Sequence, residues 1–314
     1  MEKQVQEMMG SLLFYLVLYP LSLLPLWLLY GLSNFIYFLL YHVIGYRKKV
    51  VFDNLQNSFP EQSEKDLKKI SKDYYRHFSD ILVEGIKNLS ISKNELKRRF
   101  RIKNPDLIDR YFNDNQSVIL TSGHFNNWEW LISIQDVLLP HQAIGIGMPL
   151  SQQSLDKRIN KKRSRFGMIV THSGDYKSKI ESLTKPYALL ILGDQSPGNE
   201  RNSYWTNFLK QRTCFVFGTE HIANSYNLPV LYYTVNKVKR GYYELEFKII
   251  CEHPNTLQYG EITEKYVNFL EMDILQHPAQ WIWSHKRWKK TEPEDINTLN
   301  KTHEKKFNTR FPRN

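Results

Sequence analysis

The sequence predicts an α/β fold with an N-terminal membrane anchor. Two short and continuously apolar runs, 118–120 and 187–192, are typical of strands that are buried on both faces of a sheet. Each run is followed at once by polar residues, which is where open α/β sheets place their chemistry. A third observation, the uncharged stretch from 8 to 46, predicts that the chain meets a membrane.

The anchor is predicted from length and composition. Residues 8–46 contain no Asp, Glu, Lys or Arg, and 11–30 supply the roughly 20 apolar residues that a membrane-spanning helix needs. Pro20 and Pro25 would kink this helix, and 32–46 would lie in the interface or form a second short helix. A buried core helix is the alternative. A signal peptide is disfavoured, since the leader has no basic region and no small-residue cleavage site follows.

Charge next to the anchor predicts its orientation. Three basic residues, 47–49, follow the apolar stretch, whereas the leader carries only Lys3. The positive-inside rule therefore places the main domain in the cytoplasm. We divide the chain into an anchor (1–46), a main domain (47–300) and a polar, basic tail (301–314) without a core-forming pattern.

Periodicity predicts further elements. Apolar residues recur at helical spacing over 61–89; they are Leu67, Ile70, Tyr74, Phe78 and Ile81. Residues 141–148 are predicted to form a strand that Pro149 ends. Residues 230–238 and 242–250 alternate well enough to form an antiparallel hairpin.

The first apolar strand leads to a His and a Glu. Ser122 and Gly123 end the strand, so His124 should lie just past its carboxyl end. If a helix began at or before His124, Glu129 would lie about 140° around the helix axis from His124, so the two would not share a face. The two meet only if the helix begins later; Asn126 could then be its N-cap, with Glu129 completing a capping box. In the structural interpretation, Glu129 only caps the helix and His124 is an ordinary loop residue. In the functional interpretation, His124 is a general base that the Glu129 carboxylate orients.

The segment Ser122-Gly123-His124-Phe125-Asn126-Asn127-Trp128-Glu129 resembles the His-x4-Asp/Glu signature of glycerolipid-type (lysophospholipid acyltransferase-like) enzymes. It is most similar to that of the lipid A biosynthesis (lauroyl/myristoyl) acyltransferase family. The similarity continues in order through 46–60, 187–195, 204–230 and 278–289. It implies a mixed, mostly parallel sheet flanked by helices on both faces.

Two positions after the first motif concern the acceptor. Family members commonly carry an aromatic or basic residue just before the Pro that ends the 141–148 strand, and Met148 takes that place. Basic residues then crowd 154–167, most of them on a solvated helix face. The resemblance implies that Arg165, or else Arg163, binds acceptor phosphate, because a guanidinium makes paired bonds to phosphate oxygens.

The second apolar strand delivers Asp194 and Gln195. Parallel strands would bring them to the same rim as His124 and Glu129. The structural alternative is a turn capped by Asp194. The resemblance implies that Asp194 and Gln195 shape the pocket and orient the acceptor or the histidine, and Asn127 is expected among the substrate-binding residues.

Charge and cysteine content limit the partners. The net charge is +11 and no nucleic-acid-binding motif accompanies it, so anionic lipids, phosphorylated saccharides and acidic carrier proteins explain it better. Trp, Lys and Arg alternate over 278–289, which also fits a membrane interface. Two cysteines, Cys214 and Cys251, form neither a disulfide framework nor a metal cluster. We expect no cofactor, metal or nucleotide.

The resemblance implies an acyltransferase of the bacterial inner membrane that moves a fatty acyl chain from acyl-acyl carrier protein to a hydroxyl of a phosphorylated glycolipid, a lipid A precursor. His124 would take the hydroxyl proton and Glu129 would hold the other ring nitrogen. One alternative is the same chemistry on another hydroxyl-bearing lipid, such as an amino-acid lipid or a pigment. The other is a non-catalytic membrane-surface binding protein. Chain length depends on pocket depth, which the sequence does not give.

Overall fold

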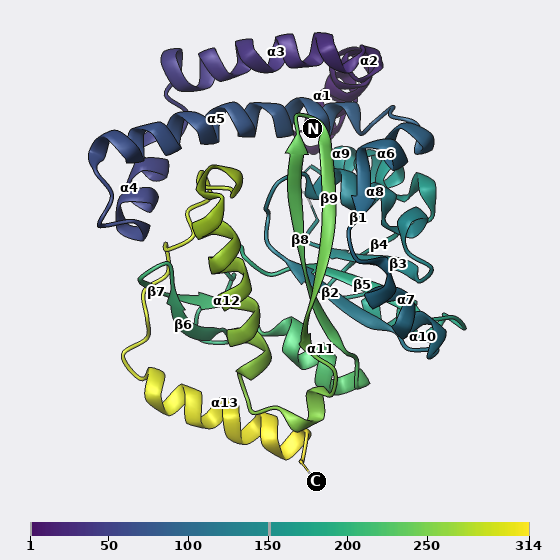
Figure 1. Ribbon diagram of the computed structural model, residues 1–314, viewed down its shortest axis with the longest axis vertical. Helices are drawn as coiled ribbons and strands as arrows, with labels where there is room; N and C mark the ends of the chain where they lie inside the picture. Colours follow the sequence, from purple (N-terminus) through teal and green to yellow (C-terminus); the bar gives the residue numbers. More distant parts are fainter. Residues whose placement is uncertain (1, 150–151, 314) are drawn as a thin grey trace.

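A seven-stranded sheet of order β1-β9-β8-β2-β5-β3-β4 forms the centre of the computed structural model, which describes residues 2–149 and 152–313 (Figure 1). Its neighbours are parallel except for the antiparallel pair β8 and β9. The strands are β1 (Phe100–Ile102), β2 (Val118–Ser122), β3 (Gln142–Gly147), β4 (Ile169–His172), β5 (Tyr187–Leu192), β8 (Val230–Lys239) and β9 (Tyr242–Cys251). A separate antiparallel pair joins β6 (Tyr204–Phe208) to β7 (Gln211–Phe215). The mixed, mostly parallel sheet is confirmed.

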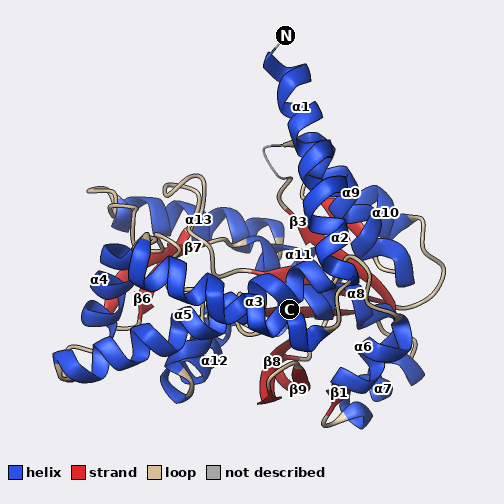
Figure 2. Ribbon diagram, turned by 90° about the horizontal axis from the view of Figure 1, so that it is seen from above, coloured by secondary structure: helices blue, strands red, loops and turns tan. Residues whose placement is uncertain are grey.

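Helices flank both faces of the sheet, as predicted (Figures 1 and 2). The α-helices are α1 (Glu2–Leu12), α2 (Tyr19–Leu23), α3 (Leu26–Phe38), α4 (Lys48–Ser58), α5 (Glu64–Lys87), α6 (Lys93–Arg99), α7 (Pro105–Asn113), α8 (Trp128–Leu138), α9 (Gln153–Arg163), α10 (Tyr176–Glu181), α11 (Gly218–Tyr226), α12 (Glu261–Gln276) and α13 (Ile296–Arg310). Two π-helical turns, η1 (Leu13–Leu18) and η2 (Leu39–Val43), continue α1 and α3, and three 3-10 turns are η3 (Ser164–Phe166), η4 (Pro254–Thr256) and η5 (Pro278–Gln280).

Strand β2 shows how the two faces are filled. Its side chains alternate across the sheet, so Ile119 packs in the core that contains α11 and α12. Val118 and Leu120 pack in the core that contains α6, α7 and α8. All five residues of β2 are buried, which explains why its first three residues, 118–120, are apolar without alternation.

The N-terminal apolar stretch is two helices and not the single kinked span predicted over 11–30. The first runs through α1, η1 and α2 to Leu23, and the second runs from Leu26 through η2 to Val43. Leu24 between them is extended, with ψ 147°, because the ring of Pro25 disfavours helical geometry at the preceding residue. Among the described residues, 26–43 is the one helix long and apolar enough to cross a membrane.

The two N-terminal helices take different directions. The amino-terminal end of α1 projects from the molecule in the view from above (Figure 2), while its carboxyl-terminal half contacts α9, where Arg158 donates to the Ser11 hydroxyl at 2.9 Å. Helix α3 instead lies alongside the long helix α5 (Figure 1). The prediction of a helix over 61–89 is confirmed by α5, which begins where the Ser63 side chain caps the Asp66 amide.

The remaining strand predictions are confirmed by β3 and by the β8–β9 hairpin. The prediction that 278–289 faces a membrane interface is wrong. Trp281, Trp283 and Arg287 are at most 1% exposed. Arg287 donates from Nη2 to the Cys214 carbonyl at 2.7 Å and stacks over the Phe215 ring at 4.1 Å. Buried acceptors and an aromatic face therefore hold this cation inside the protein.

The chain ends in a helix that packs on the main domain. Helix α13 begins at Ile296, so the predicted boundary at residue 300 falls inside it. Phe307, within the predicted polar tail, is 5% exposed and contacts the rings of Phe217 and Tyr259. One aromatic side chain thus docks a helix whose other residues are mostly polar. Met1 and Asn314, at the outer ends of the predicted anchor and tail, lie outside the described residues.

We expect Phe307→Ala to lower the free energy of unfolding by about 3 kcal/mol, because it removes a buried aromatic ring and leaves a cavity. Urea unfolding in detergent would measure the change. The neighbouring Lys306→Ala variant, at an exposed position of the same helix, is the control and should unfold like the wild type. Equal stability of the two variants would show that α13 does not dock through Phe307.

Candidate active site

Polar residues meet at the carboxyl ends of β2 and β5, as predicted. The two strands are parallel neighbours, with Ser122 in register with Leu192. The Gly193 amide donates to the Ser122 carbonyl at 3.1 Å, so the pairing continues one residue beyond β5. This places His124 beside Asp194 and Gln195, which come from a distant part of the sequence.

His124 is held by Asp194 through two contacts. Asp194 Oδ1 lies 2.6 Å from His124 Nδ1, and Oδ2 accepts the His124 backbone amide at 2.7 Å. The Trp281 indole donates to the same Oδ2 at 2.8 Å. Burial alone would raise the pKa of Asp194, but His124 and the Trp281 donor outweigh it and hold the pKa of this carboxyl below its usual value. Asp194 is therefore a carboxylate, and the ring proton of neutral His124 lies on Nδ1.

The other ring nitrogen of His124 faces an exposed side chain. His124 Nε2 lies 3.2 Å from Gln195 Nε2, which donates to it when the ring proton is on Nδ1. Gln195 is exposed and can give way to another donor. The Trp128 ring packs edge-on against the imidazole, with centroids 5.1 Å apart, and so fixes its plane. His124 is thus prepared to accept a proton at Nε2.

A glycine makes the approach of Asp194 possible. A Cβ atom at Gly123 would lie 2.8 Å from Asp194 Oδ2 and 2.8 Å from Leu270 Cδ1. Real Cβ atoms do not approach other atoms this closely, so any side chain at this position must displace the carboxylate or the packing behind it. The Gly between strand and histidine therefore belongs to the site.

The helix after His124 begins one residue later than predicted. Asn127 is the N-cap of α8, and its Oδ1 accepts the Trp130 amide at 2.9 Å. Asn126 precedes the helix with a φ of 52°, a left-handed conformation that Asn tolerates better than most residues. Its side chain donates to Gln280 Oε1 at 2.7 Å. The predicted capping box of Asn126 with Glu129 is therefore wrong.

The predicted contact between Glu129 and His124 is also wrong. Glu129 accepts from Arg163 at both carboxylate oxygens, with Nε at 3.0 Å from Oε2 and Nη2 on Oε1. Both ring nitrogens of His124 already face Asp194 and Gln195. Burial would lower the pKa of Arg163, but the charge of Glu129 outweighs it and raises this pKa. Glu129 thus orients a cation and not the imidazole.

Two other predicted substrate contacts are used inside the protein. Asn127 is fully buried, and its Nδ2 donates to Glu84 Oε2 at 2.6 Å. Arg165 donates to the carbonyls of Lys162 at 2.6 Å and Ile91 at 3.0 Å. Burial lowers the pKa of Arg165 to about 10. Both side chains therefore hold the framework around the site through these contacts.

An apolar pocket of about 300 Å³ lies next to Trp128, the residue that packs against the histidine. This volume lies at the lower end of the range of about 300–1,000 Å³ that is usual for ligand sites. Trp128 lines the pocket and also touches His124, while Glu129 and Arg163 form a charged part of its wall. The other lining residues are Leu18, Phe78, Ile81, Leu82, Gly85, Ile86, Asn88, Leu89, Ile159, Lys162 and Ile282. Most of these side chains are apolar, so the pocket suits an apolar chain.

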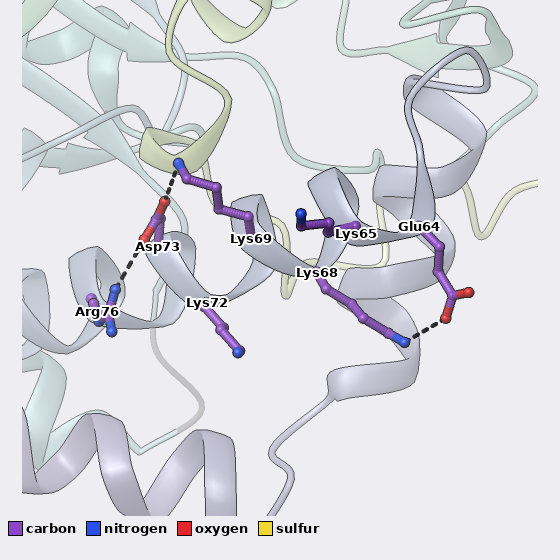
Figure 3. Close-up of a pocket in the computed structure, with 7 residues that line it drawn as sticks. All are labelled: Glu64, Lys65, Lys68, Lys69, Lys72, Asp73 and Arg76. Carbon is purple, nitrogen blue, oxygen red and sulfur yellow. Dashed lines mark hydrogen bonds and ion pairs between the residues drawn. The ribbon is translucent and has the colours of Figure 1, made fainter.

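A larger hollow of about 640 Å³ lies on α5 and has a different character (Figure 3). All of its lining residues are charged: Glu64, Lys65, Lys68, Lys69, Lys72, Asp73 and Arg76. None of these residues contributes to the histidine site, and an open basic surface suits anions and not an acyl chain. We therefore assign the chemistry to the smaller pocket.

No group of three metal-ligating side chains occurs among residues 2–149 and 152–313. Both cysteines are buried and unpaired. Burial raises the pKa of Cys214, and it raises the pKa of Cys251 to about 11, so both stay protonated thiols near neutral pH. Neither thiol is therefore an activated nucleophile.

Sequence reasoning missed Trp281 and Trp128 as parts of the site. Trp281 lies in a segment that composition assigned to a membrane surface, and nothing in its local pattern indicates that its indole reaches Asp194. Trp128 packs its ring against His124, although its own sequence pattern does not distinguish it from an ordinary core aromatic residue. Their roles depend on the loop conformation and on tertiary contacts.

The fold and the site together define an α/β enzyme with a carboxylate-oriented histidine beside an apolar pocket. The chain belongs to the bacterial lipid A biosynthesis acyltransferase family, whose model matches residues 3–290. It is therefore an acyltransferase. The lipid A biosynthesis palmitoleoyltransferase of Escherichia coli (strain K12) is 22% identical over 255 residues, which cover 81% of this chain and 82% of the relative. The lipid A biosynthesis acyltransferase of Shigella flexneri matches to the same extent.

We expect Gly123→Ala to abolish most acyltransferase activity while the protein stays folded, because the added methyl group displaces Asp194 from His124. Gly174→Ala is a matched control, since nothing lies within 4 Å of a Cβ atom there. Activity and circular dichroism of the two variants would be compared. Full activity of Gly123→Ala would show that the close approach of Asp194 is not needed.

Proposed function

We propose that the enzyme transfers a fatty acyl group from acyl-acyl carrier protein to a hydroxyl of a lipid A precursor, on the cytoplasmic side of a bacterial inner membrane. The observation that carries the proposal is the His124–Asp194 pair beside an apolar pocket, in a chain of this family. The basic residues 47–49 that follow the apolar helices suit the anionic cytoplasmic leaflet, which supports the cytoplasmic side.

In this mechanism His124 acts as the general base. Its Nε2 takes the proton of the acceptor hydroxyl as the oxygen attacks the thioester carbonyl. The tetrahedral intermediate then breaks its bond to sulfur, and the imidazolium returns the proton to the departing thiolate. Asp194 stabilises the imidazolium and keeps the ring in the productive tautomer. Gln195 occupies the position of the hydroxyl until the acceptor displaces it.

The donor chain would occupy the apolar pocket. Its lining by residues of η1, α5 and α8 supplies continuous apolar contact up to Trp128, next to the base. The thioester would then lie at the polar end of the pocket. An acidic carrier protein is the donor that a chain with a net charge of +11 would attract over a distance.

The acceptor phosphate would meet Arg163 in preference to Arg165. Arg163 lies in the pocket wall with Lys162, whereas Arg165 is committed to two backbone carbonyls. Glu129 fixes the plane of the Arg163 guanidinium through its two hydrogen bonds. Glu129 would then be a positioning residue for the phosphate contact, and the neighbouring Lys162 would add the uncompensated positive charge.

Mass spectrometry of lipid A from cells with and without the gene tests the acceptor. We expect the loss of one acyl mass, which wild type restores and His124→Ala does not, because the base is missing. Immunoblots would verify equal amounts of the two proteins. If lipid A is unchanged and another hydroxyl-bearing lipid loses its acyl group, the chemistry stands and the acceptor assignment fails.

Steady-state kinetics would separate the two carboxylates. Asp194→Asn should lower kcat by about a hundred- to ten-thousand-fold, because the imidazolium loses its counter-charge and the ring its tautomer. Glu129→Gln should mainly raise KM for the phosphorylated acceptor, by about tenfold or more, since a charge-assisted contact to Arg163 is lost.

The order of these effects is the decisive comparison. A larger loss of kcat in Glu129→Gln than in Asp194→Asn would return the orienting role to Glu129. An acceptor that lacks phosphate would serve as a further control, because its KM should respond little to Glu129→Gln.

A further inference from the structure

Exposed apolar side chains are concentrated in the N-terminal helices. Of 23 large hydrophobic residues that are exposed in the described part of the chain, 16 lie between Met8 and Tyr46. On α3 they include Trp27, Leu28, Phe35 and Phe38, with exposed fractions from 40% to 71%. A soluble surface rarely carries such a contiguous apolar area, so this face contacts something apolar.

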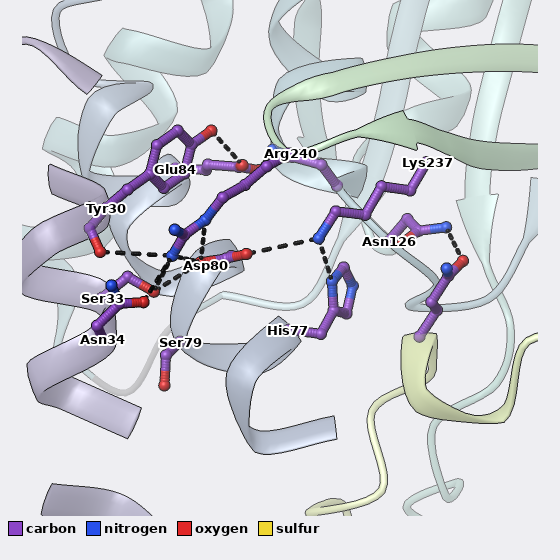
Figure 4. A network of polar contacts seen from close by, with 12 residues as sticks. Tyr30, Ser33, Asn34, His77, Ser79, Asp80, Glu84, Asn126, Lys237 and Arg240 are labelled. Carbon is purple, nitrogen blue, oxygen red and sulfur yellow. Dashed lines mark hydrogen bonds and ion pairs between the residues drawn. The ribbon is translucent and has the colours of Figure 1, made fainter. Parts of the chain in front are cut away.

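The opposite face of α3 is fastened to α5 by polar contacts (Figure 4). The Ser33 hydroxyl donates to Asp80 Oδ1 at 2.7 Å, and the Tyr30 hydroxyl donates to Glu84 Oε1 at 2.7 Å. Leu26, Leu29 and Ser33 are buried along this side. Helix α3 thus has one face attached to α5 and an opposite face with large exposed apolar side chains.

The carboxylates that receive these bonds lie inside the protein. Glu84 is fully buried and Asp80 is 6% exposed. Burial raises the pKa of Glu84, although Tyr243 and Tyr30 donate to it and oppose the rise. Removing a donor from a buried carboxylate leaves an uncompensated charge or an unsatisfied polar group, which is strongly destabilising.

A third segment closes over the same contacts. Arg240, at the turn between β8 and β9, donates from Nε to Asp80 Oδ1 at 2.9 Å and from Nη2 to Asn34 Oδ1 at 3.1 Å. The tip of this hairpin reaches the layer formed by α3 and α5 (Figure 1). Lys237 adds a contact to His77 Nδ1 at 3.3 Å. The sheet, α5 and α3 are therefore joined through one set of polar groups.

These contacts are incompatible with a membrane-spanning α3. If α3 crossed the bilayer while docked, the charged helix α5 and Arg240 would enter the hydrocarbon beside it, at a high cost per charge. If α3 left α5 to cross alone, Asp80 and Glu84 would lose the hydroxyl donors of Ser33 and Tyr30. The charges of α5 and Arg240 disfavour the first arrangement, and the buried carboxylates disfavour the second.

We propose that α3 lies in the plane of the membrane, with its outer face in the interface of one leaflet, and anchors the enzyme from one side. An interfacial helix buries one apolar face about 5–10 Å deep while its polar face stays out of the lipid. The polar contacts of α3 with α5 replace the water that such a helix normally meets. This proposal concerns the mode of attachment and does not depend on the proposed acceptor or donor.

Charge beside α3 identifies the surface as one that contains anionic lipids. Lys48 lies 4.1 Å from the Tyr41 ring and Arg76 lies 5.2 Å from the Tyr37 ring, at the carboxyl end of this helix. Arg76 also belongs to the basic hollow of α5 (Figure 3). Aromatic rings at headgroup depth with cations next to them are the pattern of an anionic membrane interface.

The test uses cysteines introduced singly at Leu28, Phe35 and Phe38 of the full chain. The two native cysteines are buried, and labelling of the wild type gives the background. An environment-sensitive fluorophore on each new cysteine is quenched by lipids with nitroxides at known depths, in vesicles of phosphatidylcholine with and without phosphatidylglycerol. Lys306→Cys on α13, which lies at the opposite end of the molecule (Figure 1), is the control that should remain in water.

We expect the three probes to lie at one shallow depth, within a few ångströms, and to require phosphatidylglycerol for binding. A spanning helix would separate the probes at 28 and 38 by about 15 Å in depth, given a rise of about 1.5 Å per residue. Such a gradient would overturn the proposal. Probes that stay in water, and that added acyl carrier protein shields instead, would overturn it in favour of a protein partner. Acyltransferase activity of each variant is measured in detergent in parallel. This measurement tests the proposed chemistry independently of the depth of α3 in the membrane.

Discussion

The buried carboxylate of Asp194 is the group on which the site depends. It sits at the end of β5, fixes His124 at the end of β2, and accepts the indole of Trp281 from the C-terminal third of the chain. A buried charge of this kind is tolerated only when its partners are in place. The parallel pairing of the two strands and the absence of a side chain at Gly123 both serve that contact.

A second buried carboxylate connects the site to the membrane-facing layer. Glu84 receives hydrogen bonds from Tyr30 of α3, from Asn127 at the start of α8, and from Tyr243 of β9. Asn127 is also the N-cap of α8, the helix that follows the loop with His124. It thereby holds Trp128 against the histidine. The attachment of α3 and the position of the imidazole therefore share a single hydrogen-bonded group, which couples the stability of the two regions.

The sequence predicted the strands and the meeting of His124 with Asp194 and Gln195, because buried parallel strands are continuous apolar runs and their carboxyl ends meet at one edge. It failed where a contact depends on loop geometry. The five-residue step to Glu129 suggested a pair, but the left-handed conformation of Asn126 turns the start of α8 and directs Glu129 to Arg163. No periodicity encodes such a turn.

The position of Trp281 has a consequence for the order in which the molecule matures during synthesis. The ribosome synthesises α3 and α5 early. The apolar face of α3 and its hydrogen bonds to α5 can therefore form while more than half of the chain is still to be made. The indole that completes the environment of Asp194 emerges near the end. A nascent chain can thus bind a lipid surface through α3 long before its active site is complete. Membrane attachment therefore precedes acyltransferase activity.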